Sequence, residues 1–154
     1  MWFLVLINFY LGFEGGINLP VIGLDYDLKS GNLFRVYIGK NDLKTGIYWN
    51  LVLGGSYYYG KNPGYSLRTY GVRLMGYKVF RSISPYLETG IDYIKRTLEK
   101  NSEWGFGFEY AIGFLINFNY ENITFYPAFY YDGVTDFKSH AGSAGVKLGL
   151  KYEW

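Results

Sequence analysis

Residues 105–114 read GFGFEYAIGF, and this stretch decides the fold class. Every second residue is bulky and apolar or aromatic, whereas the residues between them are small or acidic. A repeat of two is typical of a β-strand, because successive side chains of a strand point to opposite faces. The stretch therefore predicts a strand whose two faces differ sharply. Its bulky positions are Phe106, Phe108, Tyr110, Ile112 and Phe114.

The same alternation recurs from one end of the 154-residue chain to the other. Counting the N-terminal segment, it predicts eight strands of about 9 to 11 residues each, joined as an antiparallel meander in one domain over residues 1–154. The stretches rich in turn residues between the strands are Lys40–Gly46, Lys61–Ser66, Arg81–Ser84, Leu98–Glu103, Asn117–Asn122 and Gly133–Ser143.

The N-terminal part allows more than one interpretation. Met1–Leu11 is apolar enough to be the remnant of a secretory signal, but it alternates with a period of two and lacks a basic start and a cleavage motif. Val21–Asn32 also alternates. It is a strand extension, a long first loop, or the true first strand if Met1–Leu11 is a signal; we favour the extension.

Composition excludes several functional classes. Aromatic residues make up 22% of the chain and charged residues only 18%, and the net charge of +2 comes without any basic run. We therefore expect no nucleic-acid partner. With no Cys and one His, neither a disulfide framework nor a metal site is expected, and no cofactor is predicted.

The nature of the two faces separates a soluble barrel from a membrane barrel. The face between the bulky residues is largely Gly and Ala, which suits a narrow interior better than a water-exposed surface. The bulky face would be a very large exposed apolar patch in water. We therefore predict an eight-stranded up-and-down antiparallel transmembrane β-barrel. The residues expected to face lipid are Leu51, Leu53, Val72, Leu74, Ile91, Phe106, Phe108, Ile112, Phe125, Phe129, Leu148 and Leu150.

The end of the chain carries a resemblance to a known family. Residues 146–154 read VKLGLKYEW, with alternating apolar residues and a terminal aromatic. In this and in its overall pattern the chain resembles the small bacterial outer-membrane barrels of the OmpA transmembrane-domain and OmpX type, although Phe is the common last residue there. The resemblance implies that Tyr152 and Trp154 are recognised by the outer-membrane insertion machinery. It also implies that both termini and the connections Lys40–Gly46, Arg81–Ser84 and Asn117–Asn122 lie in the periplasm. Because the chain stops at Trp154, we expect no appended peptidoglycan-binding domain.

Charged residues on the inward face predict a network inside the barrel. Strand registers estimated from turn centres place Arg73 opposite Asp92, Asp92 opposite Glu109, Glu109 opposite Tyr130, and Tyr130 opposite Lys147. Arg35 is expected one layer away. Because an unpaired charge in a closed interior is costly, we expect these groups to pair and to plug the lumen. An acidic cation site at Glu88, Asp92 and Glu109 is the alternative, and the nearby cations favour charge compensation.

Candidate catalytic residues are sparse. His140 lies in the predicted outer loop 136–143, near two Ser and an Asp, but the spacing matches no lipid-modifying motif that we can identify. We expect a non-enzymatic, monomeric membrane protein with a structural or surface-interaction role, in contact with membrane lipid and open to an extracellular ligand through its outer loops. The alternatives are an outer-leaflet lipid-modifying enzyme, such as a lipid A deacylase or acyltransferase, and a soluble lipocalin-like barrel.

Overall fold

The computed structural model describes residues 9–23, 28–42, 46–135 and 140–154, with the side chains of residues 22, 23, 41 and 42 left aside. The described residues form one antiparallel sheet. Its strands are β1 (Phe9–Gly23), β2 (Leu28–Asp42), β3 (Ile47–Gly60), β4 (Tyr65–Lys78), β5 (Ile83–Leu98), β6 (Asn101–Ile116), β7 (Phe118–Tyr120), β8 (Ile123–Thr135) and β9 (His140–Glu153).

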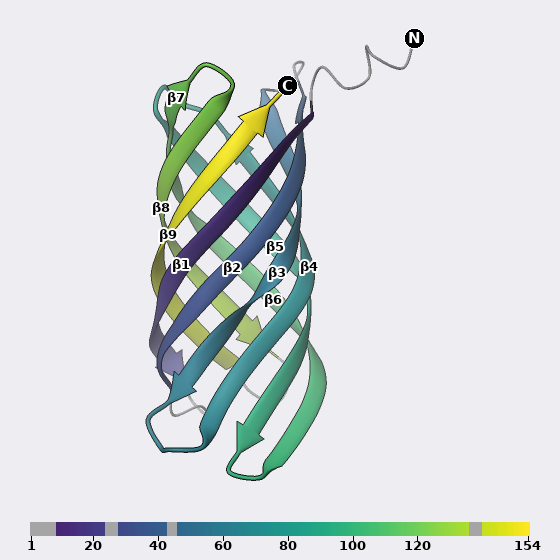
Figure 1. The fold of residues 1–154 in the computed structure, drawn as a ribbon, viewed down its shortest axis with the longest axis vertical. Helices are drawn as coiled ribbons and strands as arrows, with labels where there is room; N and C mark the ends of the chain where they lie inside the picture. The colour runs from purple at the N-terminus through teal and green to yellow at the C-terminus, as the bar shows by residue number, and fades with distance from the viewer. Residues whose placement is uncertain (1–8, 24–27, 43–45, 136–139) are drawn as a thin grey trace.

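The sheet closes on itself into a barrel of tilted strands (Figure 1). From β1 to β6 each strand pairs with the next along the chain, β8 pairs with both β6 and β9, and β1 pairs with β9. The short strand β7 follows β6 after a break at Asn117 and pairs with the start of β8. Together, β6 and β7 therefore count as one of the eight strands of the barrel. The predicted eight-stranded up-and-down antiparallel barrel is therefore confirmed.

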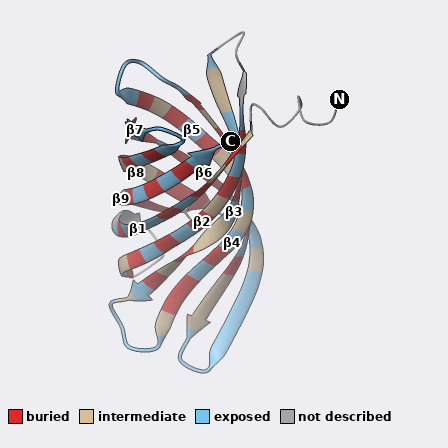
Figure 2. Cartoon of the chain, turned by 45° about the horizontal axis from the view of Figure 1, so that its top comes forward, coloured by how far each residue is buried: buried red, intermediate tan, exposed pale blue. Residues whose placement is uncertain are grey.

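Burial alternates along the strands, as Figure 2 shows. The structure places all of the predicted lipid-facing residues on the outward face, where their exposed fractions run from 40% for Phe108 to 73% for Phe106. The inward face carries most of the charged residues of the strands together with tyrosines and glycines. The wall is therefore apolar outside and polar inside, which is the reverse of a soluble barrel.

Glycines on the inward face make room for tyrosine rings. Tyr37 pairs with Gly12 across β1 and β2, and Tyr126 pairs with Gly149 across β8 and β9. A Cβ atom added at either glycine would overlap the partner's ring. The same relation holds in three further pairs, Tyr10–Gly39, Tyr86–Gly113 and Tyr130–Gly145. Each ring lies across the neighbouring strand at the one residue type that leaves space for it.

The connections are shorter than the sequence predicted. The connection within Leu98–Glu103 is reduced to Glu99 and Lys100, and that within Asn117–Asn122 to a two-residue turn, because the flanking residues pair as strands. Glu99 and Glu121 adopt positive φ angles in these tight turns. The loop predicted at Gly133–Ser143 is likewise shorter, since β8 runs to Thr135 and β9 begins at His140.

The N-terminal part agrees with the favoured interpretation. Strand β1 runs to Gly23 and β2 begins at Leu28, so most of Val21–Asn32 extends these two strands. Within Met1–Leu11, residues 9–11 belong to β1 and pair with β2, whereas residues 1–8 lie outside the described residues. The question of a signal remnant therefore concerns residues outside the described part.

Pro127 lies in the middle of β8, where a proline has no N–H to donate to the ladder and is often accommodated by a bulge. The register between β8 and β9 runs through Pro127 without a shift. On its other side the ladder with β6 ends at Ala128, and the ladder with β7 begins at Phe125. The missing N–H of the proline is therefore accommodated by a gap between two ladders instead of a bulge.

Candidate functional site

The middle of the barrel interior holds a network of buried ion pairs, which we call the lumen charge network. Its members are Glu14 (β1), Arg35 (β2), Arg73 (β4), Glu88 and Asp92 (β5), Glu109 (β6) and Lys147 (β9), each at most 3% exposed. Period-two alternation turns all seven inward, and the barrel's curvature brings strands far apart in sequence within reach of one another.

Arg35 lies at the centre of this network. Its Nη1 donates to Glu88 Oε2 at 2.8 Å, and its Nη2 donates to Glu109 Oε1 at 2.6 Å. Both carboxylates come from the opposite half of the chain. Arg35 therefore connects β2 through the interior to β5 and β6, two strands that are not its neighbours in the sheet.

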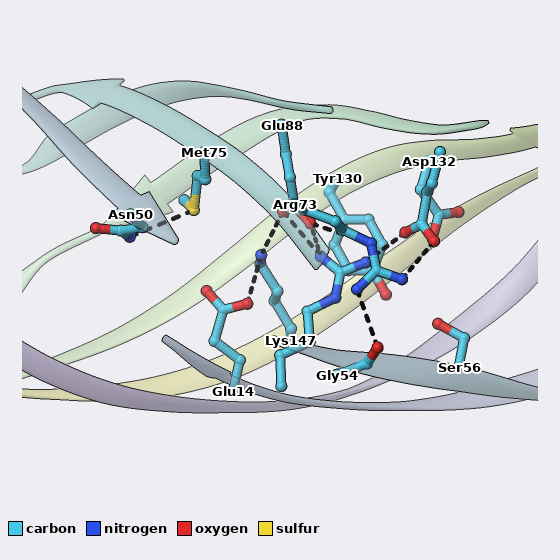
Figure 3. A network of polar contacts seen from close by, with 12 residues as sticks. Glu14, Asn50, Gly54, Ser56, Arg73, Met75, Glu88, Tyr130, Asp132 and Lys147 are labelled. Atoms are coloured by element: carbon cyan, nitrogen blue, oxygen red, sulfur yellow. Dashed lines mark hydrogen bonds and ion pairs between the residues drawn. The ribbon is translucent and has the colours of Figure 1, made fainter. Parts of the chain in front are cut away.

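Arg73 shares one of these carboxylates. Its Nη2 donates to Glu109 Oε2 at 2.6 Å and to Asp92 Oδ2 at 2.7 Å, and its Nη1 donates to the Gly54 carbonyl oxygen at 3.3 Å. Figure 3 shows this guanidinium among its partners. Because Glu109 bridges Arg35 and Arg73, the two cations and their acids form one connected group.

Lys147 anchors the other side of the network to β1. Its Nζ donates to Glu14 Oε2 at 2.8 Å and lies 4.6 Å from the centre of the Tyr86 ring (Figure 3). The second oxygen of Glu14 accepts a hydrogen bond from Tyr126 Oη at 2.7 Å. Each of the three cations thus faces at least one carboxylate, as buried charges require.

A second polar group lies between the network and the end of the barrel that holds the connection between β1 and β2. Tyr58 Oη accepts from Asn18 Nδ2 at 2.8 Å and donates to Asp132 Oδ2 at 3.4 Å. Ser143 Oγ donates to the other oxygen of Asp132, and Tyr130 Oη donates to Asn18 Oδ1. These hydrogen bonds therefore satisfy both oxygens of the Asp132 carboxylate.

Apolar and aromatic layers enclose these polar groups at both ends. Toward the connection between β1 and β2, buried residues Leu28, Leu67, Ile94 and Val134 pack together with Tyr58. Toward the termini, a tyrosine layer includes Tyr10, Tyr37, Tyr77 and Tyr126. The charged atoms of the network are thus separated from both openings of the barrel.

The predicted registers are wrong by two or four residues. Arg73 lies opposite Gly90, Asp92 opposite Gly107, Glu109 opposite Val134, and Tyr130 opposite Gly145. Moving a turn centre by one residue moves the pairing by two. The turns are centred at Arg81–Ser82, Glu99–Lys100 and Glu121–Asn122, because the residues on either side of each turn pair with one another.

Contacts within the network also differ from the predicted belt. The structure brings Arg35, Arg73, Asp92 and Glu109 together, and it places Arg35 at the centre instead of one layer away. Tyr130 lies to one side, with its ring 5.6 Å from Lys147 Nζ. Lys147 reaches Glu14, a residue that was not among those predicted for the network.

Two further buried acids, one in the lumen charge network and one in the second polar group, were not predicted from the sequence. Glu88 was considered only as part of an acidic cation site, yet it pairs with Arg35 at 2.7 Å. Asp132 was not singled out, although its burial beside Ser143 completes the second polar group. Period-two parity could have found both, since each lies on the inward face of its strand.

Candidate catalytic residues do not converge. His140 is the first residue of β9 and stacks on Tyr110, with 3.4 Å between Tyr110 Oη and His140 Nε2. Ser143 points inward to Asp132, and among the described residues no hydrogen bond joins it to His140. The other serine and acid of the predicted loop, Ser139 and Asp136, lie outside the described residues.

Two features are absent from the described residues. No group of three or more His, Asp or Glu side chains there could hold a metal ion. No helix in that part of the chain is long and apolar enough to cross a membrane.

Comparison with known proteins supports the fold. No protein-family model and no curated protein matches the sequence. Solved structures do match. The N-terminal β-barrel domain of Pseudomonas aeruginosa OprF has a TM-score of 0.64 and 12% identity, over 93% of this chain and 97% of that one. Neisserial surface protein A has a TM-score of 0.61 and 13% identity, over 95% and 97% of the two chains.

A third structure extends the same result. Ail, the attachment invasion locus protein of Yersinia pestis, has a TM-score of 0.60 and 16% identity, over 94% of this chain and 99% of that one. All three are eight-stranded barrels of the OmpA and OmpX type. The chain therefore has the fold of these small barrels along nearly its whole length.

Proposed function

We propose that this chain is an integral outer-membrane β-barrel with a plugged polar lumen and a non-enzymatic structural or surface-interaction role. One observation carries the proposal: large apolar side chains cover the outward face of every barrel strand, while the charges of the lumen charge network are buried inside. An outward surface of this size is stable only against hydrocarbon. The fold shared with outer-membrane barrels supports the choice of membrane.

The spacing of outward cations supports insertion across a bilayer. Arg68 and Lys78 bound the outward apolar residues of β4, ten residues apart. At about 3.3 Å per residue and a strand tilt of about 40°, this separation covers roughly 25 Å along the barrel axis. That height equals the apolar band of outer-membrane barrels. Each cation lies at a headgroup level, where long basic side chains are stable.

Packing of the interior supports a plugged lumen. The side chains of Arg35, Arg73 and Lys147 are inaccessible to water, and their carboxylate partners come from β1, β5 and β6. An eight-stranded barrel is just wide enough for side chains to fill it. We expect no continuous pore through such a layer.

The non-enzymatic part of the proposal rests on the arrangement of polar groups. Buried acids of the network face cations, and Ser143 faces Asp132 in the interior. The connections opposite the termini include only Lys61–Gly64 and Glu99–Lys100 among the described residues, so a partner bound there has a small interface. With the termini in the periplasm, as in the resembling family, this end is extracellular.

Detergent-folded protein and planar bilayers test the proposal. A folded outer-membrane barrel migrates differently on a gel before and after boiling, and we expect this shift after insertion into lipid vesicles. We also expect no stable conductance steps of porin size. A protein that stays monomeric in water without detergent would contradict membrane insertion, whereas steady large conductance would contradict the plugged lumen alone.

The C-terminal residues provide a test of the insertion partner. Tyr152 and Trp154 are outward and exposed, with ring centres 5.9 Å apart. We propose that the outer-membrane insertion machinery recognises this pair. Replacing Trp154 with Ala should slow assembly in the presence of the purified machinery and leave spontaneous insertion into thin vesicles unchanged. Equal slowing in both assays would contradict the recognition role.

A further inference from the structure

Two cations lie side by side on the outward face of the barrel, near the end away from the termini. Arg68 of β4 is the register partner of Lys95 of β5. Tyr57 on β3 pairs with Arg68, and Trp104 on β6 pairs with Lys95. The four residues thus form one continuous row across four strands, which we call the cationic row.

The two cations lack an acidic partner. Register partners on one face of a sheet lie about 5 Å apart, and like charges in such positions repel each other. The Arg68 guanidinium lies 4.8 Å from the centre of the Tyr57 ring, and Lys95 Nζ lies 4.3 Å from that of Trp104. Among the described residues, neither cation forms an ion pair with a carboxylate. Inside the barrel, by contrast, every cation of the lumen charge network has one.

The height of the cationic row is set by the rows next to it. One step toward the middle of the barrel, the outward residues are Tyr70, Tyr93 and Phe106, and Tyr93 stacks on Trp104. A further step in, the outward residues are fully apolar, as at Val72 and Ile91. Aromatic girdles mark the boundary between hydrocarbon and headgroups. The cationic row therefore lies at the level of lipid phosphates.

A groove in the outer wall begins beside the cationic row. Gly55 lies between Phe34 and Tyr70 on the neighbouring strands, and with no side chain there the wall is thin. The resulting hollow has a volume of about 480 Å³ and is predominantly apolar. Its wall includes Tyr57 of the row itself. The groove lies over β2, β3 and β4, next to Arg68 along the row and at the level of Tyr70, one row nearer the middle of the barrel.

We propose that the cationic row binds the phosphate group of a lipid in the outer leaflet, with an acyl chain of that lipid in the groove at Gly55. A phosphate placed between Arg68 and Lys95 would accept charge-assisted hydrogen bonds from both and remove their repulsion. The adjoining apolar groove distinguishes a lipid from a free anion, which would use the cations alone. The inference rests on the proposed membrane insertion and adds a preferred lipid class to it.

The matched control lies at the other end of the same barrel. Lys40 and Lys78 are also outward and also lie near aromatic rings, 5.8 Å from the centre of Phe9 and 5.6 Å from that of Phe80. They lie on β2 and β4, separated by β3, so they are not register partners. The double variant R68Q/K95Q and the control K40Q/K78Q remove the same charge from the two ends.

The experiment measures lipid binding to detergent-folded protein by native mass spectrometry. The probes are bisphosphorylated lipid A, uncharged diacylglycerol and inorganic phosphate, each titrated separately. Each Lys or Arg near an anionic lipid surface strengthens binding, so removing both cations should raise the Kd about 30-fold. We expect this rise for lipid A with R68Q/K95Q and wild-type binding with K40Q/K78Q. The charge-preserving variant R68K/K95R should retain binding.

Several outcomes would overturn the inference. Equal weakening by both double variants would indicate general charge attraction, and inorganic phosphate that competes at the same concentration would indicate an anion site without lipid. Equal affinity for diacylglycerol would remove the role of the phosphate. The heat-dependent gel shift is measured first on every variant. Its absence in the wild type contradicts the proposed function, whereas its presence with unselective lipid binding contradicts only this inference.

Discussion

The inner and outer faces of this barrel wall handle charge in opposite ways. Inside, Arg35 and Arg73 are fully buried and share the carboxylate of Glu109 at 2.6 Å. Outside, Arg68 and Lys95 are paired with aromatic rings instead of acids. All four residues lie on strands with the same period-two pattern, so the difference comes from the side of the wall on which each residue falls.

The surroundings of a cation decide which partner it needs. In the interior no water or lipid phosphate can reach a guanidinium, so the protein itself must supply the countercharge. In the proposed membrane orientation, headgroups and water would provide it at the rim of the apolar band, and the aromatic ring would only hold the cation in place.

The largest effect is expected from Arg35→Met. The substitution leaves Glu88 and Glu109 without a central partner in the closed interior, and breaking a buried pair in this way costs about 3 to 5 kcal/mol. The free energy of unfolding can be measured in vesicles by urea titration, with the gel shift as the probe of folding. Arg68→Met is the matched outer variant and should unfold at the wild-type urea concentration. Similar losses for both would contradict the comparison.

The next largest loss of stability is expected from a cation placed within the apolar band. Leu74 is outward and lies between the levels of Arg68 and Lys78 on β4. Leu74→Lys should destabilise the inserted barrel by about 2 to 4 kcal/mol, the usual cost at the bilayer midplane. Phe80→Lys, beyond Lys78, should cost far less because it lies near the interface. Urea titration in vesicles checks both, and equal costs would show that β4 does not cross hydrocarbon.

A smaller loss is expected where a glycine makes room for a tyrosine. A side chain at Gly149 would overlap the Tyr126 ring, so Gly149→Val should lower the free energy of unfolding by about 1 to 3 kcal/mol. Gly105 is the control, since a Cβ atom there meets nothing within 4 Å. Gly105→Val should therefore be tolerated. If the two substitutions had the same effect, strand propensity and not ring packing would explain the glycines.

The smallest effect is expected from His140→Ala. His140 contacts Tyr110 on the outward side and lies on the opposite face from Ser143. We expect a change in stability of about 0.5 kcal/mol or less and no change in the acylation pattern of lipid A in cells that express the variant. A loss of lipid A modification that depends on His140 would favour the lipid-modifying enzyme over the proposed role.

Much of the site followed from parity along the strands. Arg35, Arg73, Asp92, Glu109 and Lys147 all lie on faces that the alternation in sequence marks as inward. The pairing among them did not follow, because it depends on turn centres. A bridge between Phe80 and Ile83 tightens one turn and shifts the register by two residues. Such a shift keeps every side chain on its face while changing its neighbours.

Contacts across the barrel interior were harder still to predict from the sequence. Arg35 meets Glu88 and Lys147 meets Glu14 only after the sheet has closed and curved. Strand tilt and stagger decide which inward residues lie at the same height along the barrel axis, and neither can be predicted from the sequence of a single strand. The cationic row escaped prediction for a related reason, since Arg68 and Lys95 become neighbours only through the register of β4 and β5.

The sequence alone determined the strands and which of their faces is apolar, because a period of two is a local property of an extended backbone. It also determined that the charges lie inward, since Gly and Ala share that face with them. The tertiary structure alone decided which charges meet, which tyrosine covers which glycine and which cations stand side by side on the outer wall. Those contacts depend on register and closure, which are set by the whole barrel together.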